Sequence, residues 1–255
     1  MDAPVTPPAG GGEDAARPAS STAEAPAAKA KPHYHGHRDR LRERFLAAGV
    51  EGLQDYELLE LILFRAMPRR DVKPLAKALL ERFGGLAGVL AADIERLTEV
   101  SGIGQAVAIE LKLVYGVSVK LLQEQVLDKP LLSSSSQLFD YLRARLSTEK
   151  IEQFRILFLD NKNRLIADEM QQQGTVNHTP VYTREVIRRA LELHASAIIL
   201  VHNHPSGDPS PSRDDVSMTM KIIEAGRTMN IRVHDHLIVG RSRVLSLRQE
   251  GYMGA

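Results

Sequence analysis

The chain has 255 residues, and its 33 basic and 32 acidic side chains leave a net charge of +1. This balance excludes a protein that coats nucleic acid or an anionic membrane through bulk electrostatics. The absence of cysteine excludes a disulfide framework, thiolate metal ligands and a cysteine nucleophile, and it is typical of a reducing compartment. No apolar run has the length of a membrane span, so we expect a cytoplasmic protein with no membrane partner.

The first half of the chain divides into a tail and a helical domain. Residues 1–32 are almost all Ala, Pro, Gly, Ser and Glu, a composition that predicts a disordered tail. From residue 33 to 125, apolar residues recur at spacings of three and four, which predicts a small all-helical domain. The polar stretch around Asp128 predicts a linker over residues 126–132, and Ser133 to Ser136 then offer an N-cap for the next helix.

The second half, residues 133–255, alternates between helical and strand patterns. A fully apolar run from Ala197 to Val201 predicts a buried central strand. Mixed helices and strands around such a strand predict an α/β sandwich built on one sheet. The expected helices cover residues 138–146, 183–193 and 214–227, and the expected strands cover residues 154–159, 164–170, 197–201, 231–239 and 244–247.

The segment from Val201 to Asp215 is the best candidate for a metal site. Residues two apart on a strand face the same side, so His202 and His204 would present two imidazoles to one point. The Pro- and Gly-rich loop that follows would bring Asp215, in the first turn of the next helix, back toward them. Two His and one carboxylate leave a fourth zinc position for water, as hydrolytic sites require.

Two plainer interpretations of the same residues stay open. A His-X-His pair is often only a polar strand end, and Ser212 with Asp215, three residues later, resembles a capping box. A nuclease assignment from the tripeptide His-Asn-His is disfavoured, because that nuclease pattern disperses its residues over a much longer stretch.

The spacing His202-X-His204, seven residues, Ser212, two residues, Asp215 resembles the JAB/MPN (JAMM) metallopeptidase motif. Within that superfamily the run His-Asn-His-Pro-Ser-Gly at 202–207 is similar to the bacterial RadC family (UPF0758). Further segments that match the family lie outside the motif: Gly36-His-Arg-Asp-Arg-Leu, Gly174-Thr-Val, Arg184-Glu-Val and Asp235-His-Leu-Ile. The resemblance implies a JAB/MPN, cytidine deaminase-like fold for the C-terminal half.

The resemblance also implies roles for individual residues. Zn²⁺ would be held by His202, His204 and Asp215, an upstream glutamate would deprotonate its water, and Ser212 would support the developing oxyanion. In JAMM peptidases the glutamate lies at the start of the strand after the first helix, where Glu152 stands here. Glu185 is the second candidate, although an acidic residue at a helix start is favoured by the dipole alone.

The resemblance is limited at one position of the motif. The well-studied deubiquitinating members have a small hydroxyl residue where this chain has Asn203, so no ubiquitin-like substrate is implied. The protein or peptide substrate is left unidentified. Metal binding is accordingly the firmer expectation, and peptidase activity depends on it.

Other histidines carry weaker expectations. His236, on a late predicted strand, is expected to lie near the site as a structural or supporting group, while His234 faces elsewhere. His33, His35 and His37 lack a carboxylate at a fitting distance on an ordered element, and we expect them to be solvent-exposed.

The segment Leu97 to Leu113 resembles a helix-hairpin-helix motif, with Gly102 and Gly104 flanking Ile103. Such a motif implies sequence-independent binding of DNA backbone, because its glycines let backbone N–H groups approach a phosphate at a helix N-terminus. The hairpin commonly has a Lys just after the turn, but this chain does not, and Gly-Ile-Gly can also make a plain helical corner. The alternating arginines at 38, 40, 42 and 44 add positive charge or form a solvated helix face.

Three functions follow in order of preference. The first is a zinc-dependent hydrolase of an amide or related bond, with a helical module that places it on DNA or a DNA-bound partner. The second is a DNA-binding accessory module of repair or recombination whose zinc is structural. A metal-dependent nuclease is disfavoured, since one metal with three protein ligands lacks the paired cations common in phosphodiester hydrolysis. The oligomeric state stays open.

Overall fold

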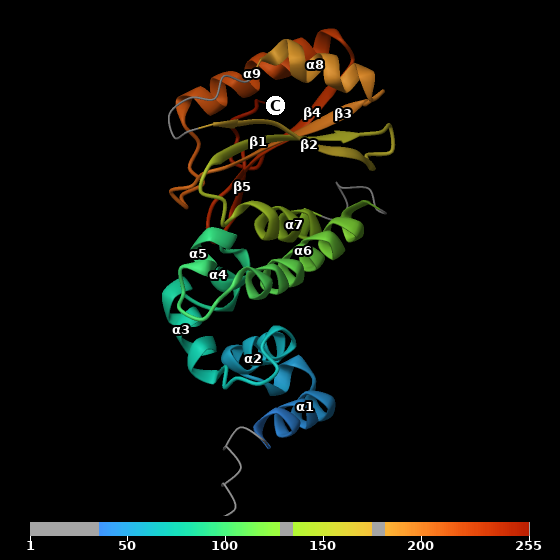
Figure 1. Cartoon of the computed structure of the whole chain (residues 1–255). Helices are drawn as coiled ribbons and strands as arrows, with labels where there is room; N and C mark the ends of the chain where they lie inside the picture. The colour runs from blue at the N-terminus through green and yellow to red at the C-terminus, as the bar shows by residue number, and fades with distance from the viewer. Residues whose placement is uncertain (1–35, 128–134, 175–181, 255) are drawn as a thin grey trace, which may run out of the picture.

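The computed structural model describes residues 36–127, 135–174 and 182–254 (Figure 1). The predicted tail, residues 1–32, lies outside the described residues, as do His33, His35 and residues 128–132 of the predicted linker. Among the described helices, none combines the length and the apolar character that crossing a membrane requires.

The N-terminal part is helical throughout. It contains α1 (His37–Ala48), a 3-10 turn (Val50–Gly52), α2 (Asp55–Ala66), α3 (Lys73–Phe83), α4 (Leu86–Ala91), α5 (Ile94–Thr98) and α6 (Gln105–Leu127). Leucines at helical spacing in α2 and α3 form the centre of a buried core, to which the first turns of α6 also contribute. The prediction of helices from the three-and-four spacing is confirmed here.

Helix α6 does not stop at the predicted domain boundary. Val107, Ala108 and Leu111 near its start belong to the first core, whereas Val119 and Val126 near its end pack in the core under the sheet. The predicted linker is therefore wrong at residues 126 and 127, which are helical. Apolar residues on the far half of α6 find partners in the second domain, and the local sequence could not show this.

The C-terminal part is one mixed sheet with helices on both faces. It contains α7 (Ser135–Leu146), β1 (Glu152–Leu159), β2 (Leu165–Gly174), α8 (Thr183–Glu192), β3 (Ala197–Asn203), α9 (Arg213–Thr228), β4 (Arg232–Val239) and β5 (Val244–Ser246). The strand order is β2-β1-β3-β4-β5, and only β3 and β4 run parallel, joined by the crossover through α9.

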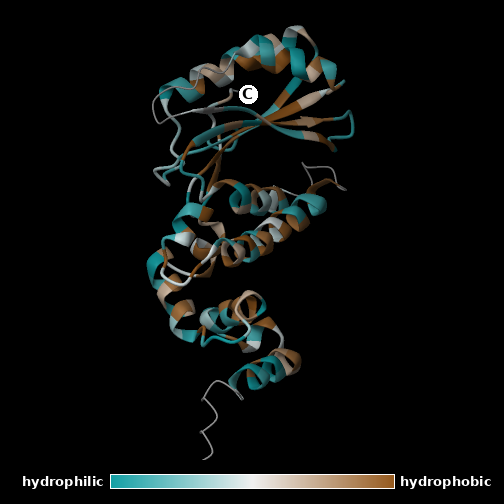
Figure 2. Ribbon diagram, in the orientation of Figure 1, coloured by the Kyte–Doolittle hydropathy of each residue, from teal (hydrophilic) through white to brown (hydrophobic). Residues whose placement is uncertain are grey.

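The sheet separates two cores and confirms the predicted α/β sandwich. Helices α8 and α9 cover one face, while α7 and the end of α6 cover the other (Figure 1). The central strand β3 is buried along its whole length, as its continuous apolar sequence predicts. Figure 2 shows the same layering, with brown apolar residues along the strands and teal ones on the outer surfaces of α8 and α9.

A buried cluster of polar side chains joins α7 to β1 and β2. Arg155 of β1 and Asp168 of β2 form an ion pair 2.8 Å long, with side chains 5% and 1% exposed. The Tyr141 hydroxyl of α7 donates a hydrogen bond to the other oxygen of Asp168. Burial, together with the neighbouring Asp168 charge, holds the pKa of Tyr141 well above its usual value, so the phenol remains a donor.

Two expectations for the first helix are corrected. His37 is not simply solvent-exposed, because its Nε2 lies 2.5 Å from a carboxylate oxygen of Glu60, which is fully buried. The arginines of α1 do more than solvate one face: Arg38 donates to the carbonyl of Met67, and Arg44 pairs with Glu57 at 2.7 Å. Both pairings span more than ten residues, so helix periodicity alone could not reveal them.

Candidate metal centre

The strand β3 places the first histidine inside the α8/α9 side of the sheet. His202 pairs in register with Phe154 of β1 and with Ile238 of β4, and it is 1% exposed. Successive strand residues alternate between faces, so His202 shares its face with Leu200 and with the apolar core beneath α8 and α9. His204 follows the end of the strand, where its backbone N–H donates to the carbonyl of Val239 at 3.0 Å.

The loop from His204 to α9 is held against the turn between β4 and β5. Gly207 has a φ of 90°, and its carbonyl accepts a hydrogen bond from the N–H of Arg241 at 3.0 Å. A Cβ on Gly240 would lie 2.6 Å from the carbonyl oxygen of Gly207 and 2.7 Å from Pro209, so only glycine permits this approach. The loop is therefore fixed, and it begins α9 at a defined point near the histidines.

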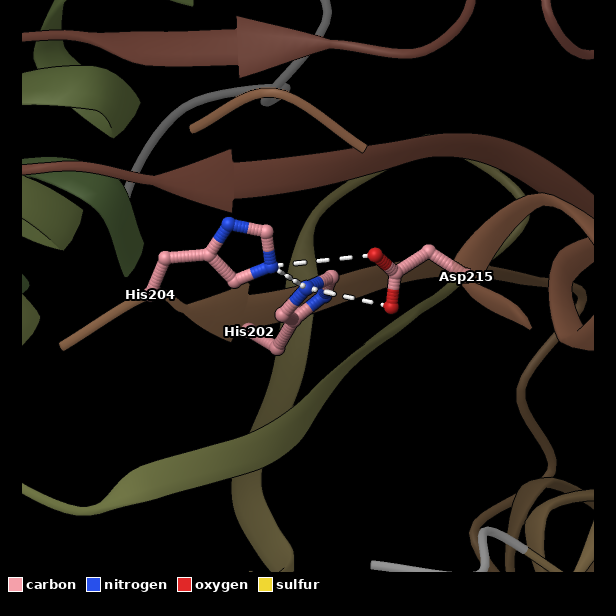
Figure 3. A group of neighbouring side chains, drawn as sticks. All are labelled: His202, His204 and Asp215. Atoms are coloured by element: carbon pink, nitrogen blue, oxygen red, sulfur yellow. Dashed lines mark hydrogen bonds and ion pairs between the residues drawn. The ribbon is translucent and has the colours of Figure 1, made fainter. Parts of the chain in front are cut away.

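Three side chains meet between β3 and the start of α9, as Figure 3 shows. The ligand atoms of His202, His204 and Asp215 all lie within 4.8 Å of one another. The Nε2 atoms of the two histidines are 2.8 Å apart, and the Asp215 oxygens lie 3.4 Å from His202 and 3.7 Å from His204. The structure thus brings together all three residues that the sequence motif proposed as ligands.

Hydrogen bonds at the far side of each imidazole orient the rings. The Nδ1 of His204 lies 2.8 Å from the carbonyl oxygen of Asp208, which can only accept, so this nitrogen carries the proton. The Nε2 of His204 therefore points into the site, where its lone pair becomes available to a metal that displaces the proton shared with His202. This arrangement, in which the outer nitrogen of a ligand histidine donates to a carbonyl, is the common one in metal sites.

His202 is oriented by a longer chain of hydrogen bonds. Its Nδ1 lies 2.8 Å from Nε2 of His236, whose Nδ1 lies 2.6 Å from the hydroxyl of Thr219. The Thr219 hydroxyl donates to the backbone carbonyl of Asp215 at 2.6 Å, which fixes the direction of every proton along the chain. His202 therefore donates from Nδ1 and presents the lone pair of Nε2, and His236 is the supporting group expected from the sequence.

The charges of the cluster suit a cation. Burial lowers the pKa of His202 to about 4, despite the opposing effect of Asp215, so its imidazole is neutral at pH 7. Burial also lowers the pKa of His236. For Asp215, burial is outweighed by the two histidines and by hydrogen bonds from Ser212, which hold its pKa below the usual value. The pKa of His204 is raised instead, because Asp215 and the Asp208 carbonyl outweigh its burial, so zinc would displace a proton from this ring. Two imidazole nitrogens and one carboxylate form a donor set that zinc accepts.

The two candidate glutamates lie in different surroundings. Glu152 is the first residue of β1, two positions before Phe154, so it shares the face and the strand end of His202. Burial lowers the pKa of His204, but Asp215, the Asp208 carbonyl and, least of all, the charge of Glu152 outweigh it and leave that pKa raised. Glu185, by contrast, forms ion pairs with Arg184 and Arg188 at the start of α8.

Ser212 caps helix α9 and contacts the third ligand. Its hydroxyl accepts from the N–H of Asp215 at 3.1 Å and donates to the Asp215 oxygen Oδ2 at 2.7 Å. The backbone N–H of Ser212 donates to the same oxygen, also at 2.7 Å. Ser212 and Asp215 thus form a capping box, and the same cap turns Oδ1 of Asp215 toward His202, so the two interpretations of these residues are compatible.

Two family models match the chain and together cover most of the described residues. A RadC-like JAB domain matches residues 132–252, and a UPF0758 N-terminal domain matches residues 35–109. The chain belongs to the RadC (UPF0758) family. The resemblance found in the sequence motif is confirmed, and it extends over both halves of this RadC-family protein.

Asn203 is a site residue whose role the sequence did not reveal. It is 1% exposed, and its side-chain oxygen accepts from the N–H of Gln153 at 2.8 Å. Its amide donates to the carbonyls of Ile151 at 3.2 Å and Glu149 at 3.4 Å. The residue between the two histidines therefore holds the chain on both sides of Glu152, which fixes that glutamate relative to the cluster.

His234 lies away from the cluster, as expected. Its Nε2 is 2.6 Å from the side-chain oxygen of Asn163, in the turn between β1 and β2. Burial lowers the pKa of His234, and the nearby charges of Arg232 and Arg248 add to this effect. The two histidines of the second His-X-His in this RadC-family chain therefore have different surroundings: His236 supports His202, whereas His234 bonds to Asn163.

The predicted hairpin residues lie between α5 and α6. Ile103 is buried in the helical core, Gly102 has a φ of 93°, and Gly104 is exposed just before α6 begins. The structure adds a residue that the sequence analysis did not consider here. The guanidinium group of Arg70 lies against Gly102, where an added Cβ would come within 3.0 Å of it.

Proposed function

We propose that this RadC-family chain is a zinc-dependent hydrolase of amide bonds, acting on a protein or peptide substrate. The observation that carries the proposal is the cluster of His202, His204 and Asp215, with ligand atoms within 4.8 Å and with the Nε2 atom of each ring directed inward by an outer hydrogen bond. Zinc held there would polarise the scissile carbonyl and lower the pKa of its water toward about 7.

Glu152 is the general base in this proposal. Its position at the entry to β1 places its carboxylate on the same face as His202, and Asn203 fixes the backbone on either side of it. A carboxylate so placed can take a proton from water and return it to the leaving amine. Glu185 is the weaker candidate, because two arginines already pair with it.

Ser212 has two roles in the proposal. Its hydroxyl orients Asp215 through the hydrogen bond of 2.7 Å, which keeps the ligand in place. Turning about one side-chain bond would direct the same hydroxyl toward a substrate oxygen, where a donor stabilises the charge that develops in the transition state. Replacing Ser212 with Ala should therefore lower both metal retention and the rate of hydrolysis.

Elemental analysis and peptide cleavage test the hydrolase proposal together. Wild type should purify with about one zinc per chain, as one three-ligand site implies, and both His202→Ala and Asp215→Ala should lose it. Glu152→Gln should keep the zinc and abolish cleavage of a peptide library, whereas the matched control Glu185→Gln should keep both. Wild type that stays metal-free after purification in zinc-replete buffer would overturn the proposal, as would cleavage that survives in Glu152→Gln.

The position of Arg70 favours DNA binding as a second function, with the zinc structural. The turn of Gly102 to Gly104 leads into the N-terminus of α6, where free backbone N–H groups can bind a phosphate. Arg70 against Gly102 provides the positive charge that the missing lysine would have given.

Binding of a labelled DNA duplex, measured by fluorescence anisotropy, tests this second function. Arg70→Glu should weaken binding roughly equally for all sequences and reduce its dependence on salt. Arg184→Glu, which changes an exposed arginine on α8 of the other domain by the same charge, is the matched control. If wild type fails to bind, or both variants bind alike, the DNA function is wrong whether or not zinc is present.

A further inference from the structure

Helix α6 is apolar on a face that the described part of the chain leaves open. Its buried residues line one side, where they join the two cores. On the other side the exposed fractions of Ile109, Leu113, Val117 and Leu121 are 50%, 56%, 50% and 56%. These four residues, spaced four apart, form a continuous band that we call the α6 stripe. A helix that is apolar all round is normally buried, and Figure 2 shows the long brown stretches of α6.

Gly116 lies at one edge of the α6 stripe, where it also lines a pocket with Arg145 of α7. It is in the interior of the 23-residue helix, is exposed, and an added Cβ would meet nothing within 4 Å. Glycine inside a helix costs about 0.5–1 kcal/mol relative to alanine. None of the described residues needs the missing side chain, and its absence leaves room for a second helix to approach α6 closely.

We propose that the α6 stripe is a dimer interface, in which the α6 helices of two copies pack antiparallel about a two-fold axis beside Tyr115. The spacing of the stripe is symmetric about this point, so Ile109 would face Leu121 of the second copy and Leu113 would face its Val117. Two-fold interfaces are self-complementary in this way.

The charges beside the α6 stripe select the antiparallel arrangement. The same axis places Glu110, which also pairs with Arg65 of α2 at 3.6 Å, opposite Lys120 of the second copy, and it sets no two like charges against each other along the stripe. A parallel pair would place Glu110 against Glu110 and Lys120 against Lys120. Such repulsion destabilises packed helices, so the sequence of the stripe fits a second copy of itself in one direction.

The interface leaves the metal centre accessible. α6 packs with α7 against the face of the sheet opposite to α8 and α9, whereas His202 faces α8 and α9 (Figure 1). The two centres of the dimer would therefore be separate, and neither needs the other copy to complete it. The dimer proposal can thus fail while the hydrolase proposal holds, and the reverse is equally possible.

Single cysteines test the register, because the full chain contains no cysteine of its own. Ile109→Cys and Leu121→Cys are made separately, mixed and treated with a short bismaleimide. The mixture should give a crosslinked dimer, whereas each variant alone should give little, since two thiols introduced at position 109 would be about 18 Å apart along the helix axis. Strong crosslinking of each variant to itself would indicate parallel packing and overturn the proposal.

The mass in solution, from sedimentation equilibrium, tests the interface itself. Wild type should be a dimer, Leu113→Asp should be at least tenfold weaker in self-association, and Leu191→Asp on exposed α8 should match wild type. Gly116→Leu should also weaken the dimer, although it improves helix propensity and should leave the fold intact by circular dichroism. A monomeric wild type, or a dimer unaffected by both α6 variants, would overturn the proposal.

A third outcome would assign the α6 stripe to a different occupant. Residues 1–32 precede the described part of the chain, so a variant lacking them is tested beside the full chain. If Leu113→Cys reacts slowly with maleimide in a monomeric full chain and rapidly after removal of residues 1–32, the tail covers the stripe. That result would overturn the dimer.

Discussion

The clamp made by Asn203 gives the sharpest test of how this site is built. The Asn203 side chain is 1% exposed and bonds to the N–H of Gln153 at 2.8 Å and to the carbonyl of Ile151 at 3.2 Å. The substitution Asn203→Ala removes both of these hydrogen bonds. Asn203 makes three hydrogen bonds in all, each contributing about 0.5–1.5 kcal/mol, so losing them together with the buried side-chain volume should lower the free energy of unfolding by about 2–4 kcal/mol. Urea unfolding followed by circular dichroism measures this loss.

The same variant separates the clamp from the ligands. The hydrogen bonds of Asn203 go to the backbone of residues 149, 151 and 153 and not to the ligand side chains, so folded Asn203→Ala should keep about one zinc per chain while its hydrolytic rate falls. Asn161→Ala removes an exposed asparagine from the turn between β1 and β2 and should match wild type in all three measurements. An Asn203→Ala protein within about 0.5 kcal/mol of wild type, judged against the loss of about 2–4 kcal/mol expected, would refute the clamp.

The remaining predictions concern the support of the ligands and the helical domain. Thr219→Val removes the hydroxyl that bridges His236 and Asp215, and it should weaken zinc binding by about 10–100-fold in competition with a chelator. The hydrogen bond from Arg44 lowers the pKa of Glu57 from its usual 4.5, so this pair stabilises the fold above that pH and the contribution disappears on acidification. Glu57→Gln should therefore be less stable than wild type at pH 7, with a smaller difference near pH 3; an equal difference at both pH values would contradict this.

The arrangement of the ligands could be predicted because it depends on local regularities. The two-residue period of a strand puts His202 and His204 at one end of β3, and the helix start at Ser212 sets the position of Asp215. The same period places Glu152 on the face of His202 once the pairing of β1 with β3 is known. The positions of these residues follow from strand periodicity or helix capping alone, so they can be predicted from the sequence.

Contacts between distant segments could not be predicted in this way. Asn203 holds residues about 50 positions earlier in the chain, and His37 meets a buried glutamate from another helix. Arg70 reaches Gly102 only because α2, α5 and α6 fold around a shared core. Each of these contacts depends on how whole helices and strands pack together, and this packing cannot be predicted from composition or residue spacing.

Helix α6 shows how one element can serve both domains beyond the boundary that the sequence predicts. Serines and a proline mark a break in local structure near residue 130, but the packing changes earlier, inside a continuous helix that serves both cores. A rigid element shared by two domains limits their relative motion, since bending it would break helical hydrogen bonds. If two copies join along this same helix, the dimer would hold both metal centres and both Gly102 hairpins in one fixed arrangement, which two domains on a flexible linker could not do.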